Sequence, residues 1–355
     1  MTAHLAAVRS HTAAELAPAT ARRHVHALPS PAELRTAMPL DPARAERIRA
    51  QRGAIRAVLA GTDPRPLAIV GPCSLHDPEA ALDYGQRLAA VADRLADDVL
   101  IVMRAYVEKP RTTVGWKGLL HDPSLDGGND LARGLRVSRD LLMELAGLGL
   151  PLATELLSPV AADYLEDCLA WAAIGARTTE SQTHRELVSG LDLPVGFKNG
   201  TDGDLGAARD AMQAAACPHA RFGSDADGRP AWIETAGNPD THLILRGGRG
   251  GPNCDAAGVA AARSMLAAAG LVPGMVVDCS HANSGKDPAR QPAVLDEVIA
   301  QRRADPAAIA GVMLESHLRP GRQGLDAPLA YGVSVTDGCL GWADTEAALE
   351  RLAAG

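Results

Sequence analysis

The strongest constraint on the fold is a regular alternation of short apolar runs with longer amphipathic segments. From Leu67 onward there are eight such runs: LAIVGPC from 67, VLIVMRAY from 99, PLATELL from 151, WAAIGAR from 171, PVGFKNG from 194, HLILRGG from 242, MVVDCSH from 275 and AGVMLESHL from 310. Helix-like stretches, such as 78–96 and 137–148, separate most of them. This alternation predicts an α/β protein with a parallel sheet, and eight repeats favour closure into a (β/α)8 (TIM) barrel. An open doubly wound sheet is the alternative, although no GxGxxG sequence follows the first run.

The segment before the first run divides into two parts. Residues 1–28 carry little pattern, and we expect a mobile N-terminal tail there. In residues 29–61, Asp41 and Pro42 provide an N-cap followed by a proline in the first helical position, and apolar residues then recur at near-helical spacing. The sequence therefore predicts a helical N-terminal extension at 29–61 and a barrel over 62–355.

Composition excludes several classes of function. The formal net charge is -8, which argues against a general nucleic-acid binder, so an anion site requires a local concentration of Arg and Lys. The chain has no apolar run long enough for a transmembrane helix, and polar residues interrupt its N-terminus before a signal-peptide core can form. We therefore expect a cytoplasmic protein without membrane contact. The cysteines show no CxxC spacing, so reduced thiols are expected, one or two of them as metal ligands.

A basic loop follows the second apolar run. Residues 103–118, MRAYVEKPRTTVGWKG, contain four cations in a segment interrupted by proline and glycine: Arg104, Lys109, Arg111 and Lys117. The hydroxyl group of Thr112 lies beside these cations in the sequence, and this mixture suits phosphate oxygens. A solvated basic loop is the alternative.

Polar residues stand at or just past the ends of all eight runs. They are Cys73, Arg104, Glu155, Arg177, Lys198, Arg246, His281 and Glu315. Each of them alone has a structural explanation, such as a small buried cysteine or a hydrogen-bonded histidine. In a barrel, however, all eight would meet at the C-terminal mouth, where active sites of this fold lie. Their coincidence predicts an active site.

One set of these residues is cationic. It contains Arg104, Arg177, Lys198 and Arg246, with Lys109 and Arg111 from the basic loop and one carboxylate, Glu155. Like charges in one cavity repel each other, so more than one anionic ligand group is expected, as phosphate or carboxylate. Lysine can act as an acid once neighbouring cations lower its pKa, and Lys109 is the candidate for this role.

The other set combines soft and hard metal ligands. It contains Cys73, His281 and Glu315, joined by Asp337 from the loop YGVSVTDGCLGW at 331. This mixture predicts one divalent transition metal (Mn, Fe, Co or Zn) rather than Mg or Ca. Because the four residues are scattered between 73 and 337, they indicate a catalytic metal rather than a structural zinc site. Separate structural roles for the four are the alternative.

Taken together, these residues make the chain resemble the class I 3-deoxy-D-arabino-heptulosonate 7-phosphate (DAHP) synthases. The motifs that carry the resemblance are GPCSLHDP at 71, MRAYVEKPRTTVGWKGL at 103, GARTTESQTHRE at 175, PVGFKNGTDG at 194, HLILRGG at 242, VVDCSHANSGKD at 276, GVMLESHL at 311 and YGVSVTDGCLGW at 331. The resemblance covers about residues 29–355. The phrases QTHRE, DCSH and YGVSVTD are nearest the tyrosine-inhibited bacterial branch.

The resemblance implies a transferase that condenses phosphoenolpyruvate with erythrose 4-phosphate and releases phosphate. This is the first step of the shikimate pathway to chorismate and the aromatic amino acids. The implied metal ligands are Cys73, His281, Glu315 and Asp337. The implied phosphoenolpyruvate ligands are Arg104, Lys109, Arg177, Lys198 and Arg246, and the implied ligands of the aldose phosphate are Arg111 and Thr112. We expect catalytic roles for Lys109 as a proton donor, Glu155 in orienting water and Lys198 in stabilising charge.

Regulation and assembly are also implied. In relatives the segment equivalent to 29–61 contacts a neighbouring subunit and the effector, so we expect a homo-oligomer (dimer or tetramer) with an aromatic amino acid inhibitor, tyrosine favoured. The chain departs from the family pattern at RGGRGGPNCD, where Cys254 replaces a usual Tyr, and at Ala132, where Asn is common. Phe222 is displaced by one position in a region that helps form the inhibitor pocket of relatives, which leaves the inhibitor open.

Two other functions stay open at this point. A related synthase makes an eight-carbon sugar acid from arabinose 5-phosphate, but the KPRTTVGWKG loop and the N-terminal extension fit it less well. A regulatory protein on an inactive barrel is the second, against which the complete set of metal ligands and cations argues. A further hypothesis concerns Cys339, two positions after Asp337: oxidation joins it to Cys73 and expels the metal.

Overall fold

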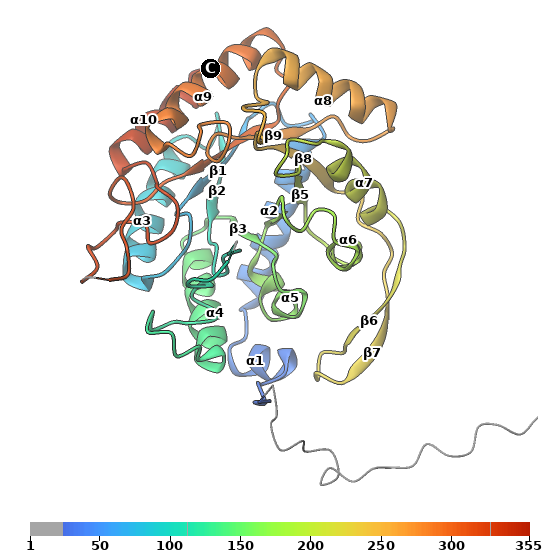
Figure 1. Ribbon diagram of the computed structural model, residues 1–355, viewed down its shortest axis with the longest axis vertical. Helices are drawn as coiled ribbons and strands as arrows, with labels where there is room; N and C mark the ends of the chain where they lie inside the picture. The colour runs from blue at the N-terminus through green and yellow to red at the C-terminus, as the bar shows by residue number, and fades with distance from the viewer. Residues whose placement is uncertain (1–23, 112, 327) are drawn as a thin grey trace, which may run out of the picture.

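Eight parallel strands close into a barrel, as expected from the eight apolar runs, so the open-sheet alternative is wrong. The computed structural model describes residues 24–111, 113–326 and 328–355, and the statements below concern these residues. The strand order around the barrel is β1-β10-β9-β8-β5-β4-β3-β2 (Figure 1). The barrel strands are β1 (Leu67–Gly71), β2 (Leu100–Arg104), β3 (Leu152–Glu155), β4 (Trp171–Ile174), β5 (Val195–Lys198), β8 (Thr241–Leu245), β9 (Met275–Asp278) and β10 (Gly311–Glu315).

A helix follows each barrel strand and packs on the outside of the barrel. In chain order these helices are α3 (Pro78–Arg94), α4 (Leu131–Gly147), α5 (Pro159–Leu165), α6 (Gln182–Val188), α7 (Gly206–Ala215), α8 (Ala256–Ala268), α9 (Gln291–Ala304) and α10 (Trp342–Ala353). Short 3-10 turns precede β4 and α9, at Glu166–Cys168 and Pro288–Arg290. Helix α4 begins earlier than the predicted residue 137, because Asp130 caps it by accepting a hydrogen bond from the amide of Arg133.

Alternate strand residues face two different apolar cores. Leu67 and Ile69 of β1 belong to the core inside the barrel, whereas Ala68 and Val70 belong to the core between the barrel and its helices. The same alternation continues to the strand ends, where the next inward position carries a polar residue. In six strands this polar residue stands two positions after the last inward-facing small or apolar residue. The residues are Arg104, Glu155, Lys198, Arg246, Asp278 and Glu315. A charged layer therefore rests on an apolar layer.

Two helices precede the barrel, α1 (Pro31–Ala37) and α2 (Pro42–Leu59), and α2 confirms the predicted helix that begins after Asp41. Ile55, Val58 and Leu59 of α2 are buried in the core inside the barrel. Arg52 donates hydrogen bonds to the carbonyl oxygens of three residues that precede β4 and β5: Glu166, Leu169 and Asp192. Helix α2 therefore covers the N-terminal end of the barrel, opposite the mouth. Most of the predicted tail, residues 1–23, lies outside the described part of the chain.

An antiparallel hairpin, β6 (Ala220–Ser224) and β7 (Pro230–Glu234), interrupts the strand and helix repeat between α7 and β8. It lies outside the barrel beside α1 (Figure 1), and the amide of Ala32 donates to the carbonyl of Ala226 in its turn (2.8 Å). The hairpin was not predicted from the sequence, because its two strands are largely exposed and neither contains a long apolar run. Within the described residues, no helix has the length and hydropathy needed to cross a membrane.

Candidate active site

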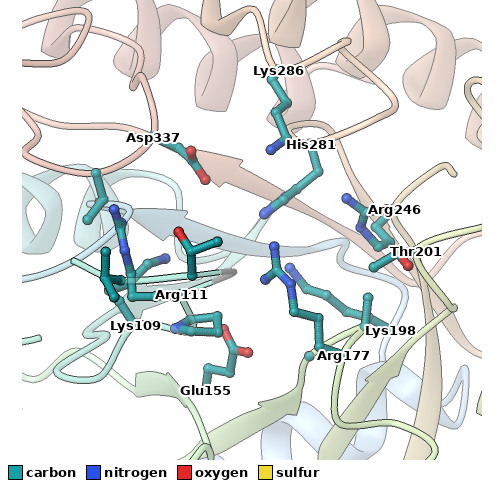
Figure 2. A pocket seen from close by; sticks show the side chains of 16 residues that line it. Lys109, Arg111, Glu155, Arg177, Lys198, Thr201, Arg246, His281, Lys286 and Asp337 are labelled. Atoms are coloured by element: carbon teal, nitrogen blue, oxygen red, sulfur yellow. The ribbon is translucent and has the colours of Figure 1, made fainter. Parts of the chain in front are cut away.

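A cavity of about 260 Å³ opens at the C-terminal mouth of the barrel. The side chains labelled in Figure 2 point into it from different strands and loops. The cations that line it are Lys109, Arg111, Arg177, Lys198, Arg246 and Lys286, and they are accompanied by Glu155, His281 and Asp337. The structure therefore places most of the predicted site residues around one cavity. Thr112 lies outside the described residues.

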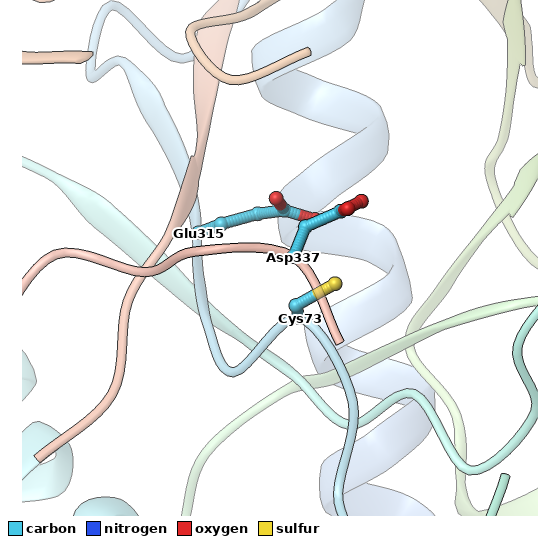
Figure 3. Close-up of side chains that lie close together, drawn as sticks. All are labelled: Cys73, Glu315 and Asp337. Carbon is cyan, nitrogen blue, oxygen red and sulfur yellow. The ribbon is translucent and has the colours of Figure 1, made fainter. Parts of the chain in front are cut away.

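Cys73, Glu315 and Asp337 form a cluster that could hold a metal ion (Figure 3). One ligand atom from each residue lies within 4.8 Å of those of the other two. Cys73 and Glu315 are buried, and the pKa of the Cys73 thiol is raised by burial and by the two neighbouring carboxylates. A bound cation would relieve this repulsion between like charges, so a thiolate with two carboxylates fits a divalent transition metal.

Glu315 is fixed in place by two buried side chains. The side-chain amide of Gln291 forms two hydrogen bonds with the main chain of Glu315. Gln291 Nε2 donates to the Glu315 carbonyl, and the Glu315 main-chain amide donates to Gln291 Oε1, both at 2.9 Å. Arg104 Nη2 lies 3.1 Å from Glu315 Oε1, and the Arg104 guanidinium stacks 4.0 Å from the centre of the Tyr106 ring. Arg104 is fully buried and does not line the cavity. Arg104 therefore supplies positive charge to Glu315 from below the floor of the cavity.

His281 lines the mouth cavity but lies outside the three-residue cluster. Its main chain is in the left-handed region (φ 54), and its Nδ1 lies 2.8 Å from Asp278 Oδ2 and 2.7 Å from Ser280 Oγ. These contacts direct Nδ1 away from the cavity, so the other ring nitrogen, Nε2, is the atom available for a ligand. A second, smaller hollow is lined by His281 together with Glu315 and Asp337.

Asp278 is a site residue that was not predicted from the sequence. It is fully buried at the end of β9, and it also accepts hydrogen bonds from Lys198 Nζ (2.8 Å) and from the amide and hydroxyl of Ser280 (3.0 and 2.7 Å). Burial opposes its ionisation, but His281 and Lys198 hold its pKa well below the usual range. The signal was the inward alternation of β9, in which Asp278 and not His281 is the last inward residue.

The pKa of Lys109 shifts in the direction opposite to the one predicted from the sequence. Its Nζ lies 3.1 Å from both the sulfur and the carbonyl oxygen of Cys73. Burial alone would lower its pKa, but Cys73, Glu315 and Glu155 outweigh burial and raise it. The expected lowering by neighbouring cations is therefore wrong, because the groups nearest to Lys109 are acidic. Lys109 is a protonated donor at neutral pH.

Further residues at the mouth were not predicted. Lys286 and Thr201 line the cavity from the loops that follow β9 and β5. Lys286 lies in the left-handed region (φ 64), in the SGKD part of a motif whose His281 alone was assigned. Cys339 is a buried free thiol, as is Cys73, and burial raises the pKa of both thiols. Their oxidation to a disulfide stays a prediction.

A closed (β/α)8 barrel whose mouth gathers cations beside a thiol and two carboxylates defines an enzyme of anionic substrates. The chain belongs to the DAHP synthetase I family, whose model matches residues 41–350. It is 51% identical to the Tyr-sensitive phospho-2-dehydro-3-deoxyheptonate aldolase of Salmonella typhimurium over 328 residues, 92% of each chain. It is also 51% identical to the Phe-sensitive aldolase of Escherichia coli K12 over 304 residues, 85% of this chain and 87% of the relative.

A solved structure gives the same result. The phospho-2-dehydro-3-deoxyheptonate aldolase of Francisella tularensis SCHU S4 is 42% identical to this chain and superposes on it with a TM-score of 0.92. The match covers 94% of this chain and 98% of the solved chain. The comparisons confirm the predicted family, the barrel and the predicted activity, that of a phospho-2-dehydro-3-deoxyheptonate aldolase. They decide against the eight-carbon sugar acid synthase and the inactive barrel.

Proposed function

We propose that this mouth condenses phosphoenolpyruvate with erythrose 4-phosphate, with one group of residues for each substrate and a third for a metal. The observation that carries this division is that a cluster of cations lines the mouth cavity together with Asp337, which also belongs to the cluster with Cys73 and Glu315. Two phosphorylated substrates supply the anions that the cations require, and an aldehyde supplies an oxygen for the metal to polarise.

Phosphoenolpyruvate is assigned to the cations at the ends of β4, β5 and β8, together with Lys109 from the loop that follows β2. Arg177 and Arg246 suit bidentate contact with its carboxylate or phosphate, while Lys109 and Lys198 supply single donors. Lys198 is held by Asp278, so its ammonium group has a fixed direction. Arg104, fully buried beneath the cavity, adds positive charge to this set without lining the cavity, and Lys286 extends the set on the β9 side. Arg111 and Thr112 are assigned to the phosphate of the aldose.

The metal ligands we propose are Cys73, Glu315 and Asp337, with His281 as the fourth through Nε2. When bound, a divalent transition metal would act as a Lewis acid on the aldehyde of erythrose 4-phosphate. The combination of a thiolate, an imidazole and two carboxylates suits Mn, Fe, Co or Zn.

The protein side chains then have separate tasks in the reaction. The methylene carbon of phosphoenolpyruvate forms a bond to the aldehyde carbon, and protonated Lys109 gives a proton to the oxygen that becomes a hydroxyl group. Arg177, Lys198 and Arg246 stabilise the substrate charges while the former enol carbon becomes electron-poor. Glu155 orients the water that adds to this carbon and takes its proton. Phosphate leaves by cleavage of its carbon–oxygen bond.

A phosphate-release assay tests this assignment. Turnover with erythrose 4-phosphate and none with arabinose 5-phosphate is the expected result. Replacing Arg111 by Ala should raise the KM for the aldose more than that for phosphoenolpyruvate. The opposite order would overturn the assignment of Arg111.

We propose tyrosine as the inhibitor, as in the relatives that are named Tyr-sensitive. A cavity of about 430 Å³ near the covered end of the barrel supports an effector site, since it is lined by both apolar and charged residues: Leu187, Leu191, Asp192, Arg221 and Ile233. The relative named Phe-sensitive has the same identity to this chain, so phenylalanine is the competing candidate. Repeating the assay with Tyr, Phe and Trp distinguishes them, and inhibition by Phe alone would refute the proposal.

We also propose a homo-oligomer that uses the β6–β7 hairpin. Phe222 and Trp232 are paired across its two strands and are 99% and 73% exposed. Such an aromatic pair on a projecting hairpin suits burial against a second copy. Light scattering of the wild type and of Trp232→Ser should show a shift toward monomer in the variant. Deleting residues 1–28 should leave catalysis intact.

A further inference from the structure

An outer cavity adjoins the mouth cavity and is distinct from the small hollow beside His281. It has a volume of about 430 Å³ and is lined by Arg111, Arg322, Gln323, Gly324, Val335, Thr336 and Asp337. Arg111, Thr336 and Asp337 line the mouth cavity as well. Arg111 and Asp337 therefore stand at the boundary of the two cavities, and Arg322 belongs to the outer one alone.

The main chain around Arg322 is fixed relative to the predicted metal ligands. Arg322 forms a bridge with Ser334, and Gly321 exchanges two hydrogen bonds with Cys339, at 2.8 and 3.1 Å. The amide of Gln323 donates to the carbonyl of Ser334 (2.8 Å). The segment that carries Arg322 is therefore joined on both sides to the loop that carries Asp337. This main-chain pairing fixes the position of the Arg322 backbone, which is therefore not part of an unpaired loop.

The charges of the outer cavity favour an anion. Its lining contains the guanidinium groups of Arg111 and Arg322 and one carboxylate, that of Asp337, which also belongs to the cluster with Cys73 and Glu315. Two guanidinium groups facing one space repel each other unless an anion lies between them. A phosphate monoester carries close to two negative charges at neutral pH and has oxygens enough for both groups.

We propose that Arg322 is a second cation for the phosphate of the aldose, opposite Arg111. The aldehyde end of the substrate lies toward Asp337 and the Cys73 cluster, and its phosphate end enters the outer cavity. This inference rests on the proposed role of Arg111 and adds a residue that discriminates phosphorylated from unphosphorylated aldoses. A solvated arginine without a ligand is the competing explanation, since Arg322 is exposed.

Steady-state kinetics of Arg322→Gln tests this inference, with Arg319→Gln as the matched control. Arg319 is an exposed arginine three positions away, and it lines neither cavity. We expect Arg322→Gln to raise the KM for erythrose 4-phosphate about five- to tenfold, as for loss of one exposed charge-assisted hydrogen bond. The KM for phosphoenolpyruvate should stay within about twofold, and Arg322→Lys should restore part of the loss.

Competition by inorganic phosphate against erythrose 4-phosphate provides a second readout. It should weaken in Arg322→Gln and stay unchanged in Arg319→Gln. The inference is overturned if the Arg322→Gln and Arg319→Gln enzymes have equal constants for erythrose 4-phosphate, or if Arg322→Gln raises both KM values equally. Arg111→Ala, assayed in parallel, separates this inference from the proposed function: an aldose-specific loss there with none in Arg322→Gln refutes only the role of Arg322. Thermal unfolding of each variant confirms that it is folded.

Discussion

Replacing Asp278 by Asn provides a sharp test of how the mouth is organised. The substitution keeps the size of the side chain but removes the charge that faces Lys198 Nζ and His281 Nδ1, each at 2.8 Å. A hydrogen bond to a charged group contributes about 1.5–3 kcal/mol, so two lost contacts correspond to about 3–6 kcal/mol. If half of this is expressed in the transition state, kcat/KM falls by at least about tenfold and by up to about 150-fold.

The Asp278→Asn enzyme should also show a specific change in Lys198. Burial lowers the pKa of Lys198, and Asp278 is the largest of the influences that raise it. Without the carboxylate the pKa should fall, so the loss of activity on raising the pH should begin at a lower pH than in the wild type. Phosphoenolpyruvate binding, followed by calorimetry from about pH 7 to 10, measures this shift. Asp98→Asn, an exposed aspartate, is the control. A folded Asp278→Asn enzyme with kinetics and pH profile equal to those of the Asp98→Asn enzyme would refute the reasoning.

Three further predictions concern other parts of the chain. His242 is buried, its pKa is lowered to about 3 by burial, and its Nδ1 has no partner among the described residues, so the folded protein excludes a proton that the unfolded chain binds. Stability should therefore fall as the pH drops below about 6.5, and His242→Gln should reduce this slope by up to about 1.4 kcal/mol per pH unit in urea unfolding between about pH 6 and 4. Gly134 lies in α4, and Gly134→Ala would place a Cβ atom against the carbonyl of Leu120 and should destabilise the fold by more than about 2 kcal/mol. Gly53 lies in α2 with open space beside it, so Gly53→Ala should stabilise the fold by about 0.5–1 kcal/mol; equal melting temperatures would contradict this. Cys73→Ser should lower the metal content measured after dialysis against a chelator, and Cys217→Ser, at an exposed free thiol, should not; equal content in the two proteins would remove Cys73 from the ligand set.

The barrel could be predicted from the sequence because its signal is repeated. Eight apolar runs with helix-like segments between them leave few arrangements, and a parallel strand buried on both sides is apolar along its whole length. The β6–β7 hairpin carries no such redundancy. Its strands are short and half-exposed, with Phe222 and Trp232 facing solvent, so their pattern does not differ from that of a polar loop.

The site could be predicted as a set of residues but not as a set of contacts. The carboxyl ends of the parallel strands of a barrel meet at one mouth, so the positions of Cys73, Glu315 and the cations in the sequence were enough to group them. Which side chains form contacts depends on their positions to within about an ångström. Those positions are set by the packing of distant segments and are not encoded in the local sequence. Lys109 was therefore expected among cations, whereas its nearest contact is Cys73, and Asp278 was overlooked between Lys198 and His281.

Helix α2 has a consequence for where this chain can be divided. Ile55, Val58 and Leu59 fill the floor of the barrel against Leu67 and its neighbours, and Arg52 ties the helix to the main chain that leads into β4 and β5. A fragment that begins at residue 62 would open this floor to water and expose the apolar layer on which the charged residues of the mouth rest. We therefore predict that the extension and the barrel unfold as one cooperative unit. Limited proteolysis should cut before α1 and leave the junction between α2 and β1 intact until the whole protein unfolds.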